Sequence, residues 1–358
     1  MAQPSADGDL TDEQRAVYDR QLRVWGVEAQ RRLGQSKFFV AGLSGLCAEA
    51  CKNVVLAGIG HMTLFEDGVL AKNAHPGNFL AHAGLADHSG DRDTLTAAEA
   101  TAATLREMNP FGVVEVVSGT GGGDGAGNNT FNTYNDFVGV TEGMLRTMNV
   151  VLLCGASLRA RERIGDLARS ANASIFAGAV RGYAADFIAD LGPNFEHVVE
   201  TVKSCTDGTF EKVKEQKSTT FVPLKTALMC SWKDLAVCRE GGMRRVNRLA
   251  AAAIAVAHFE RRNGRVPNKN GDSDINSLID LIPGLEREAG VKPGWFKPET
   301  LSEYVGTTEE APAVAAIIGG VLAQEMLRAV THVGEPVRNG FFFGMEGGQG
   351  TCENLGCP

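Results

Sequence analysis

The apolar residues of this chain occur in short runs that alternate with helical patterns. The run Lys37–Ala41 ends at glycines, helical spacing follows over Cys47–Ala57, and a second apolar run covers His61–Phe65. A strand, a glycine turn, a helix and a strand within about thirty residues make a βαβ unit. This order predicts an α/β fold of the Rossmann-like, doubly wound type, with a mostly parallel sheet.

The alternation continues further along the chain. We expect helices over Thr94–Met108 and Ala160–Ala171. Strands are expected over four apolar runs, which are Val113–Val117, Val150–Leu153, Ser174–Ala177 and Ala184–Asp190. A later apolar pattern predicts a helix over Ala311–Val330 and a strand over Gly340–Phe343.

The pattern divides the chain into three parts. Residues 1–192 form the Rossmann-like domain with an N-terminal helix, 193–298 are an inserted mixed α+β region, and 299–358 return to the first fold. Within the insertion, we expect an alanine-rich helix over Leu249–Phe259 and a polar loop over Asn263–Asp274. The segment 118–129 (SGTGGGDGAGNN) is too rich in glycine to hold one backbone conformation, so it is expected to be a disordered surface loop without chemistry.

A helix is expected near the N-terminus. Thr11 and Gln14 have the spacing of a capping box, so Thr11 can begin a helix that continues to Leu33. Arg23 lies four residues after Asp19, the spacing of an ion pair on a solvated helix face. The residues that give the helix its apolar positions are Tyr18, Leu22, Trp25 and Leu33.

Composition excludes several classes of protein. The 358 residues have a net charge of -8, whereas a surface for nucleic acid needs a basic excess. The N-terminus is polar and the run Leu249–Phe259 is too short to span a bilayer, so we expect a soluble protein of the cytosol or nucleus, without a membrane partner. The eight cysteines include no C-x-x-C pair, and we therefore expect neither a metal site nor a disulfide framework.

The turn after the first strand is a degenerate nucleotide motif. In G-x-G-x-x-G the second and third glycines allow close approach of phosphates and tight helix packing. Here Gly42 and Gly45 remain, but Ser44 and Cys47 stand where those two glycines would be. We interpret the turn as one kept for packing, and assign no bound cofactor to it.

Three segments resemble the activating enzymes of ubiquitin-like proteins, the E1 family. They are Tyr18–Gly26 (YDRQLRVWG), the E-x-x-K-N-x-x-L-x-G pattern over Glu49–Gly58, and the helix with Ala311-Pro312, Gly319-Gly320 and Ala323-Gln324-Glu325. The resemblance implies an adenylation fold. It also implies that Arg20 reaches in trans across a dimer interface to ATP phosphates that the partner binds.

The chain departs from active E1 enzymes at four places. Glu66 replaces the aspartate that binds the ribose, Ala97 replaces a lysine, and Ala156-Ser157 replaces an Asp-Asn pair. Asn78-Phe79 follows Pro76-Gly77, where N-R-Q precedes the phenylalanine in the family. A MgATP site needs cations for the triphosphate and a carboxylate for the metal. The resemblance therefore implies the inactive half of a heterodimeric E1, whose partner binds ATP and magnesium.

Among such halves, the chain is most similar to the small-subunit family of SUMO-activating enzymes. The similarity includes the length, the segment Phe221–Leu228 and the ending Phe341–Gly356. It implies a regulatory, non-thioester-forming subunit whose partners are a larger catalytic subunit, SUMO and, indirectly, the SUMO E2. It also implies location in the nucleus and the cytoplasm.

Four alternatives remain open. Cys205-Thr206 copies the Cys-Thr of thioester sites, but a turn-like Asp207-Gly208 follows it. The chain could be the regulatory half of the neddylation E1, which is longer, or a self-sufficient homodimeric adenylating enzyme of the bacterial sulfur-carrier type. It could also be an NAD-dependent oxidoreductase that uses Glu66 or Asp67 for the ribose.

Overall fold

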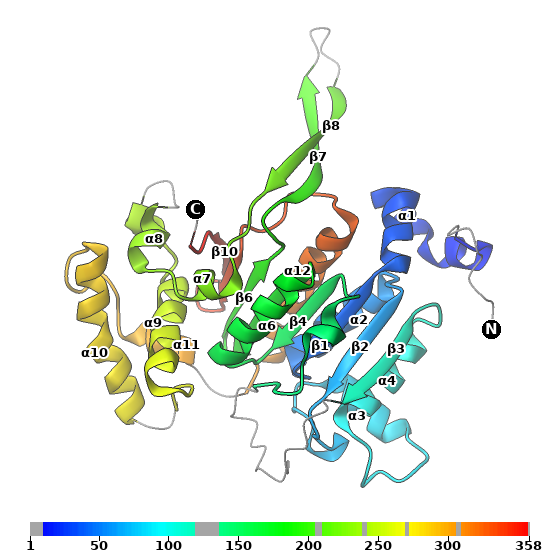
Figure 1. Ribbon diagram of the computed structural model, residues 1–358, viewed down its shortest axis with the longest axis horizontal. Helices are drawn as coiled ribbons and strands as arrows, with labels where there is room; N and C mark the ends of the chain where they lie inside the picture. The colour runs from blue at the N-terminus through cyan, green and yellow to red at the C-terminus, as the bar shows by residue number, and fades with distance from the viewer. Residues whose placement is uncertain are drawn as a thin grey trace.

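A computed structural model describes residues 10–118, 136–204, 210–237, 242–268, 272–305 and 309–356. Its centre is an eight-stranded sheet in the order β10-β9-β6-β5-β4-β1-β2-β3, with helices on both faces (Figure 1). The strands are β1 (Lys37–Ala41), β2 (His61–Glu66), β3 (Val113–Ser118), β4 (Val150–Cys154), β5 (Ser174–Arg181), β6 (Ala184–Asp190), β9 (Gly340–Gly344) and β10 (Gln349–Glu353).

Strands β3, β2, β1, β4 and β5 pair in parallel, which is the strand order of nucleotide-binding folds. Strands β6, β9 and β10 extend the sheet in antiparallel fashion. The predicted Rossmann-like α/β fold is therefore confirmed. In such sheets a ligand crevice forms where the strand order reverses, and here that point lies between β1 and β4.

Alternation within each strand explains the two buried faces. In β1, Phe38 and Val40 join the core beneath one helical layer, whereas Phe39 and Ala41 join the core on the other side. The first layer contains α2 (Gly45–Leu56), α4 (Ala97–Met108) and α12 (Pro312–Thr331). The second contains α6 (Leu158–Ser170), α7 (Leu224–Leu228), α8 (Trp232–Val237), α9 (Arg248–Asn263), α10 (Asp272–Ala289) and α11 (Glu299–Val305).

The region 193–298 contains two kinds of structure. Strands β7 (Phe195–Ser204) and β8 (Phe210–Thr219) form a separate two-stranded sheet that projects from the body (Figure 1). Helices α7 to α10, in contrast, share the core on one face of the main sheet. The three-part division of the chain stays a prediction.

Two local predictions need correction. The expected loop Asn263–Asp274 is shorter, because α9 continues through Asn263 and α10 begins at Asp272. Helix α10 forms there because apolar residues at helical spacing, Leu278, Ile282 and Leu285, pack into the core. Ser118 is the last residue of β3 rather than the start of a loop, and residues 119–129 lie outside the described part of the chain.

Helix α12 is long and apolar enough to cross a membrane by length and composition, but 56% of the tested window is buried inside the protein. A core helix passes the same test. A Cβ atom on Gly319 would lie 2.5 Å from the Cβ of Glu49, so α12 packs closely against α2.

Candidate functional site

The N-terminal helix α1 (Asp12–Gln35) begins as predicted. The N–H of Thr11 donates to Gln14 Oε1 at 3.0 Å, and the N–H of Gln14 donates to Thr11 Oγ at 3.2 Å, which confirms the capping box. The Arg23 guanidinium lies 2.9 Å from Asp19, as the spacing predicted. The prediction of one continuous helix was wrong, because Gly26 (φ 84°, ψ 168°) interrupts it.

Polar side chains hold α1 against the carboxyl end of α2. Gln21 Nε2 donates to the carbonyl of Leu56 at 3.3 Å, and Gln30 Nε2 donates to the carbonyl of Ala57 at 2.9 Å. These carbonyls belong to the end of a helix, where no intrahelical donor is available. Helix α1 therefore satisfies groups that would otherwise lack partners.

A third contact comes from the end of α4. Asn109 is buried, and its Nδ2 donates to the carbonyl of Val55 at 2.7 Å and to the Tyr18 hydroxyl at 2.9 Å. Burial raises the pKa of Tyr18, so its hydroxyl stays protonated. The inner face of α1 is thus fixed through Tyr18, Gln21 and Gln30.

The outer face of α1 presents Arg20 on an apolar surface. Val17 and Val24, three residues before and four after Arg20, are 63% and 81% exposed. At this spacing the three side chains share one face of the helix. Arg20 is exposed and has no hydrogen-bond or ion-pair partner among the described residues. Exposed apolar residues around an arginine are typical of a protein interface.

The glycine turn brings together the four predicted residues of the degenerate motif. Gly42 has φ +88°, and a Cβ there would lie 1.9 Å from the carbonyl oxygen of Cys154, so only glycine fits between β1 and β4. Ser44 caps α2 by accepting a hydrogen bond from the N–H of Cys47 at 3.4 Å. Cys47 is buried, with its Sγ 3.7 Å from that of Cys51. The two replaced glycines have thus become a helix cap and a core residue.

Sequence reasoning missed one residue at this turn. The Glu310 side chain, only 6% exposed, reaches the amino end of α2, where the N–H of Leu46 donates to its Oε2 at 3.0 Å. Burial raises the pKa of Glu310 to about 7, although the Ser44 hydroxyl and the backbone amides of Leu46 and Gly45 lower it. The sole sequence signal was its place directly before Ala311-Pro312, and nothing local indicated where the carboxylate would lie.

The four departures from active E1 enzymes have local structural roles. Glu66 ends β2, and its Oε1 accepts a hydrogen bond from the N–H of Gly68 at 2.6 Å. Asn78 caps α3 (Phe79–Asp87) through the N–H of Ala81 at 3.1 Å. Ser157 caps α6. Ala97 is buried at the first position of α4, after the Thr96 cap.

No group of three or more histidine, cysteine, aspartate or glutamate residues within the described ranges could hold a metal ion. The candidate thioester residue Cys205 lies outside those ranges.

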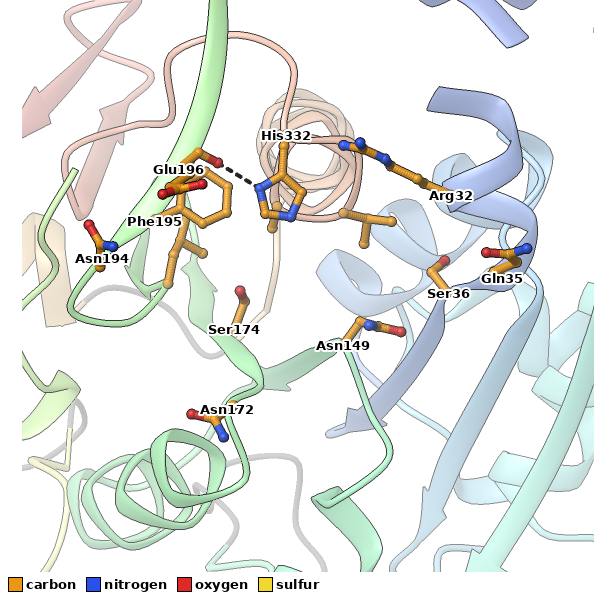
Figure 2. Close-up of a pocket in the computed structure, with 13 residues that line it drawn as sticks. Arg32, Gln35, Ser36, Asn149, Asn172, Ser174, Asn194, Phe195, Glu196 and His332 are labelled. Atoms are coloured by element: carbon orange, nitrogen blue, oxygen red, sulfur yellow. Dashed lines mark hydrogen bonds between the residues drawn. The ribbon is translucent and has the colours of Figure 1, made fainter. Parts of the chain in front are cut away.

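A cavity of about 590 Å³ lies at the opposite end of the strands (Figure 2). Ser36, Asn149 and Ser174, which line it, lie at the amino ends of β1, β4 and β5. His332 Nδ1 is 2.6 Å from the carbonyl oxygen of Glu196 in its wall. Doubly wound folds bind nucleotides at the carboxyl ends of the strands. This polar cavity therefore lies away from the crevice where such folds bind nucleotides.

Comparisons with known proteins place the sequence in a family. The model of the ThiF family matches residues 18–357, and the chain belongs to that family. SUMO-activating enzyme subunit 1B-1 of Arabidopsis thaliana is 30% identical over 352 residues, which cover 98% of each chain. SUMO-activating enzyme subunit 1 of Xenopus laevis is 28% identical over 97% of each chain, and that of Homo sapiens is 27% identical over 98%.

Proposed function

We propose that this chain is the small, non-thioester-forming subunit of a heterodimeric SUMO-activating enzyme. Relatives named SUMO-activating enzyme subunit 1 or 1B-1 match it over nearly their whole length. In the proposed reaction, the complex uses ATP to adenylate the C-terminal carboxylate of SUMO. A cysteine of the larger subunit then displaces AMP to form a thioester, and SUMO passes to an E2.

The observation that carries the proposal is Arg20 on the outer face of α1. It is exposed between Val17 and Val24, and within the described ranges it pairs with no residue of its own chain. A guanidinium suits phosphate oxygens because it donates two parallel hydrogen bonds and keeps its charge at all physiological pH values. Arg20 would complete the larger subunit's ATP site in trans.

We further propose that the larger subunit binds ATP and magnesium, and that this chain alone makes no acyl-adenylate. The proposal is supported by the neutral residues at the expected nucleotide positions, where Asn78 and Ser157 serve as helix caps and Ala97 is buried. The partners in this scheme are the larger subunit, SUMO and, indirectly, the E2. The proposed location is the nucleus, with a cytoplasmic fraction.

Reconstitution tests the function. The chain is purified alone and after co-expression with a larger SUMO-activating subunit, and ATP–pyrophosphate exchange and SUMO thioester formation are measured for both. We expect activity from the pair and none from the chain alone. SUMO-dependent pyrophosphate exchange by the isolated chain would contradict the division of roles, and failure to form the pair would contradict the assignment.

A further inference from the structure

We propose that the Glu310 carboxylate occupies, at the amino end of α2, the place that a phosphate group takes in nucleotide-binding folds, and that it closes this turn to nucleotides. The proposal concerns this chain alone. It does not depend on which partner the chain has or on what that partner activates.

The donors that Glu310 uses are those that a phosphate would use. The first N–H groups of a helix have no intrahelical acceptor, and the helix dipole favours an anion there. The N–H of Leu46 donates to Glu310 Oε2 at 3.0 Å, and Gly45 and the Ser44 side chain also hydrogen-bond to this carboxylate. A nucleotide phosphate would have to displace Glu310 to reach these donors.

The backbone around the turn is shaped to admit the carboxylate. A Cβ on Gly45 would lie 2.5 Å from Glu310 Oε2, closer than any side chain tolerates. The backbone of Gly77 lies beside Gly45, and a Cβ on Gly77 would lie 3.1 Å from the Cα of Gly45. The lack of a side chain at Gly45 thus leaves the space that the Glu310 carboxylate fills.

Backbone hydrogen bonds hold Glu310 in position. It lies just before α12 and forms a bridge with Gly182, which follows β5. The N–H of Ala311 donates to the carbonyl of Gly182 at 3.2 Å, and the N–H of Gly182 donates to the carbonyl of Glu309 at 3.2 Å. Glu310 is 264 positions away from Leu46 in the sequence, and these contacts hold it at the turn.

The charged and titratable groups around Glu310 do not neutralise it. His75 Nδ1 is 3.9 Å from Glu310 Oε2, but it accepts a hydrogen bond from the N–H of Gly77 at 3.1 Å. Burial lowers the pKa of His75, so the imidazole is neutral at pH 7. Two buried cysteines, Cys47 and Cys154, are further titratable groups close to it. The donors of the turn are therefore the principal stabilisation of the carboxylate.

The test is anion rescue of Glu310→Ala, with Glu310→Gln as the matched control. Removal of the carboxylate leaves the donors of the turn unpaired beside a space of its size. Formate or inorganic phosphate should fill this space and raise the Tm of Glu310→Ala by about 2 °C or more above an equal ionic strength of chloride. The wild type and Glu310→Gln, whose side chains fill the space, should show no such rise.

A second measurement locates the anion. In the wild-type chain, inorganic phosphate or ADP should leave the backbone amide resonances of Gly45 and Leu46 in place, whereas in Glu310→Ala phosphate should shift both. Shifts in the wild type would overturn the proposal. So would equal effects of formate on all three proteins, or no effect on Glu310→Ala. If Glu310→Ala does not fold, Glu310→Asp, whose carboxylate is withdrawn by one methylene group, takes its place.

Discussion

Replacement of Arg20 by alanine separates a contact with a partner's ATP from a role inside this chain. Arg20 is exposed and lacks a partner among the described residues, so its removal should change the free energy of unfolding by no more than about 0.5 kcal/mol. Truncation of one partner of a charge-assisted contact that is desolvated in a complex costs about 2 to 5 kcal/mol. Since about 1.36 kcal/mol corresponds to a tenfold rate, adenylation should slow by about thirty-fold to several thousand-fold.

Arg23→Ala is the matched control for this prediction. Arg23 lies on the same helix, is 76% exposed and forms an i,i+4 ion pair with Asp19. Such exposed pairs contribute about 0.3 to 0.5 kcal/mol to stability. Because Arg23 pairs within its own helix, the rate for Arg23→Ala should stay within about threefold of the wild type. Arg20→Lys should regain part of the rate, because lysine keeps the charge but loses the two parallel donors.

The assay is ATP–pyrophosphate exchange by each variant paired with the larger subunit, at concentrations where gel filtration shows complete assembly. An unchanged rate for Arg20→Ala would refute the trans role. Equal losses for Arg20→Ala and Arg23→Ala would also refute it, because they would indicate a general effect of charge on α1. A loss that disappears at higher subunit concentration would assign Arg20 to assembly instead of phosphate binding.

Three further predictions concern stability. Asn109→Ala removes the buried donor of the Tyr18 hydroxyl and one donor of the Val55 carbonyl, which keeps the N–H of Gly58, so urea denaturation should show a loss of about 1 to 3 kcal/mol. Gly26 has φ 84° and ψ 168°, a conformation almost restricted to glycine, so Gly26→Ala should cost about 1 to 3 kcal/mol. Gly42→Ala should cost more in the same assay because its Cβ would clash with the Cys154 carbonyl. Folding raises the pKa of Glu310 from 4.5 to about 7. The contribution of Glu310 to the free energy of unfolding is therefore full below pH 4.5 and declines as the pH rises through 7. Relative to Glu310→Gln, the wild type should lose about 2 to 3 kcal/mol of stability between pH 5 and 8 in denaturation curves.

The sequence predicted best what depends on neighbouring residues. The capping box of Thr11 and Gln14 and the ion pair of Asp19 and Arg23 follow from spacings of three and four residues, and the structure contains both. The order of β1, α2 and β2 follows from apolar periodicity, and the parallel sheet follows from that order.

Contacts between distant segments could not be predicted in this way. Glu310 reaches Leu46 across 264 positions, and its glutamate has no local feature that indicates burial. The interruption of α1 at Gly26 was missed because helices tolerate an isolated glycine. The interruption at Gly26 is bridged by Gln30, whose side chain accepts a hydrogen bond from Trp25 Nε1 at 3.1 Å.

The two ends of α2 therefore have different roles in this chain. At its amino end, Glu310 takes the donors that a phosphate would need. At its carboxyl end, Gln21 and Asn109 use the carbonyls of Leu56 and Val55 to fix α1, and with it Arg20. Twelve helical residues separate these ends by about 18 Å. Sites this far apart with no shared partner act independently as a rule. The proposed closure of one end of α2 to nucleotides therefore leaves undisturbed the arginine that the other end presents.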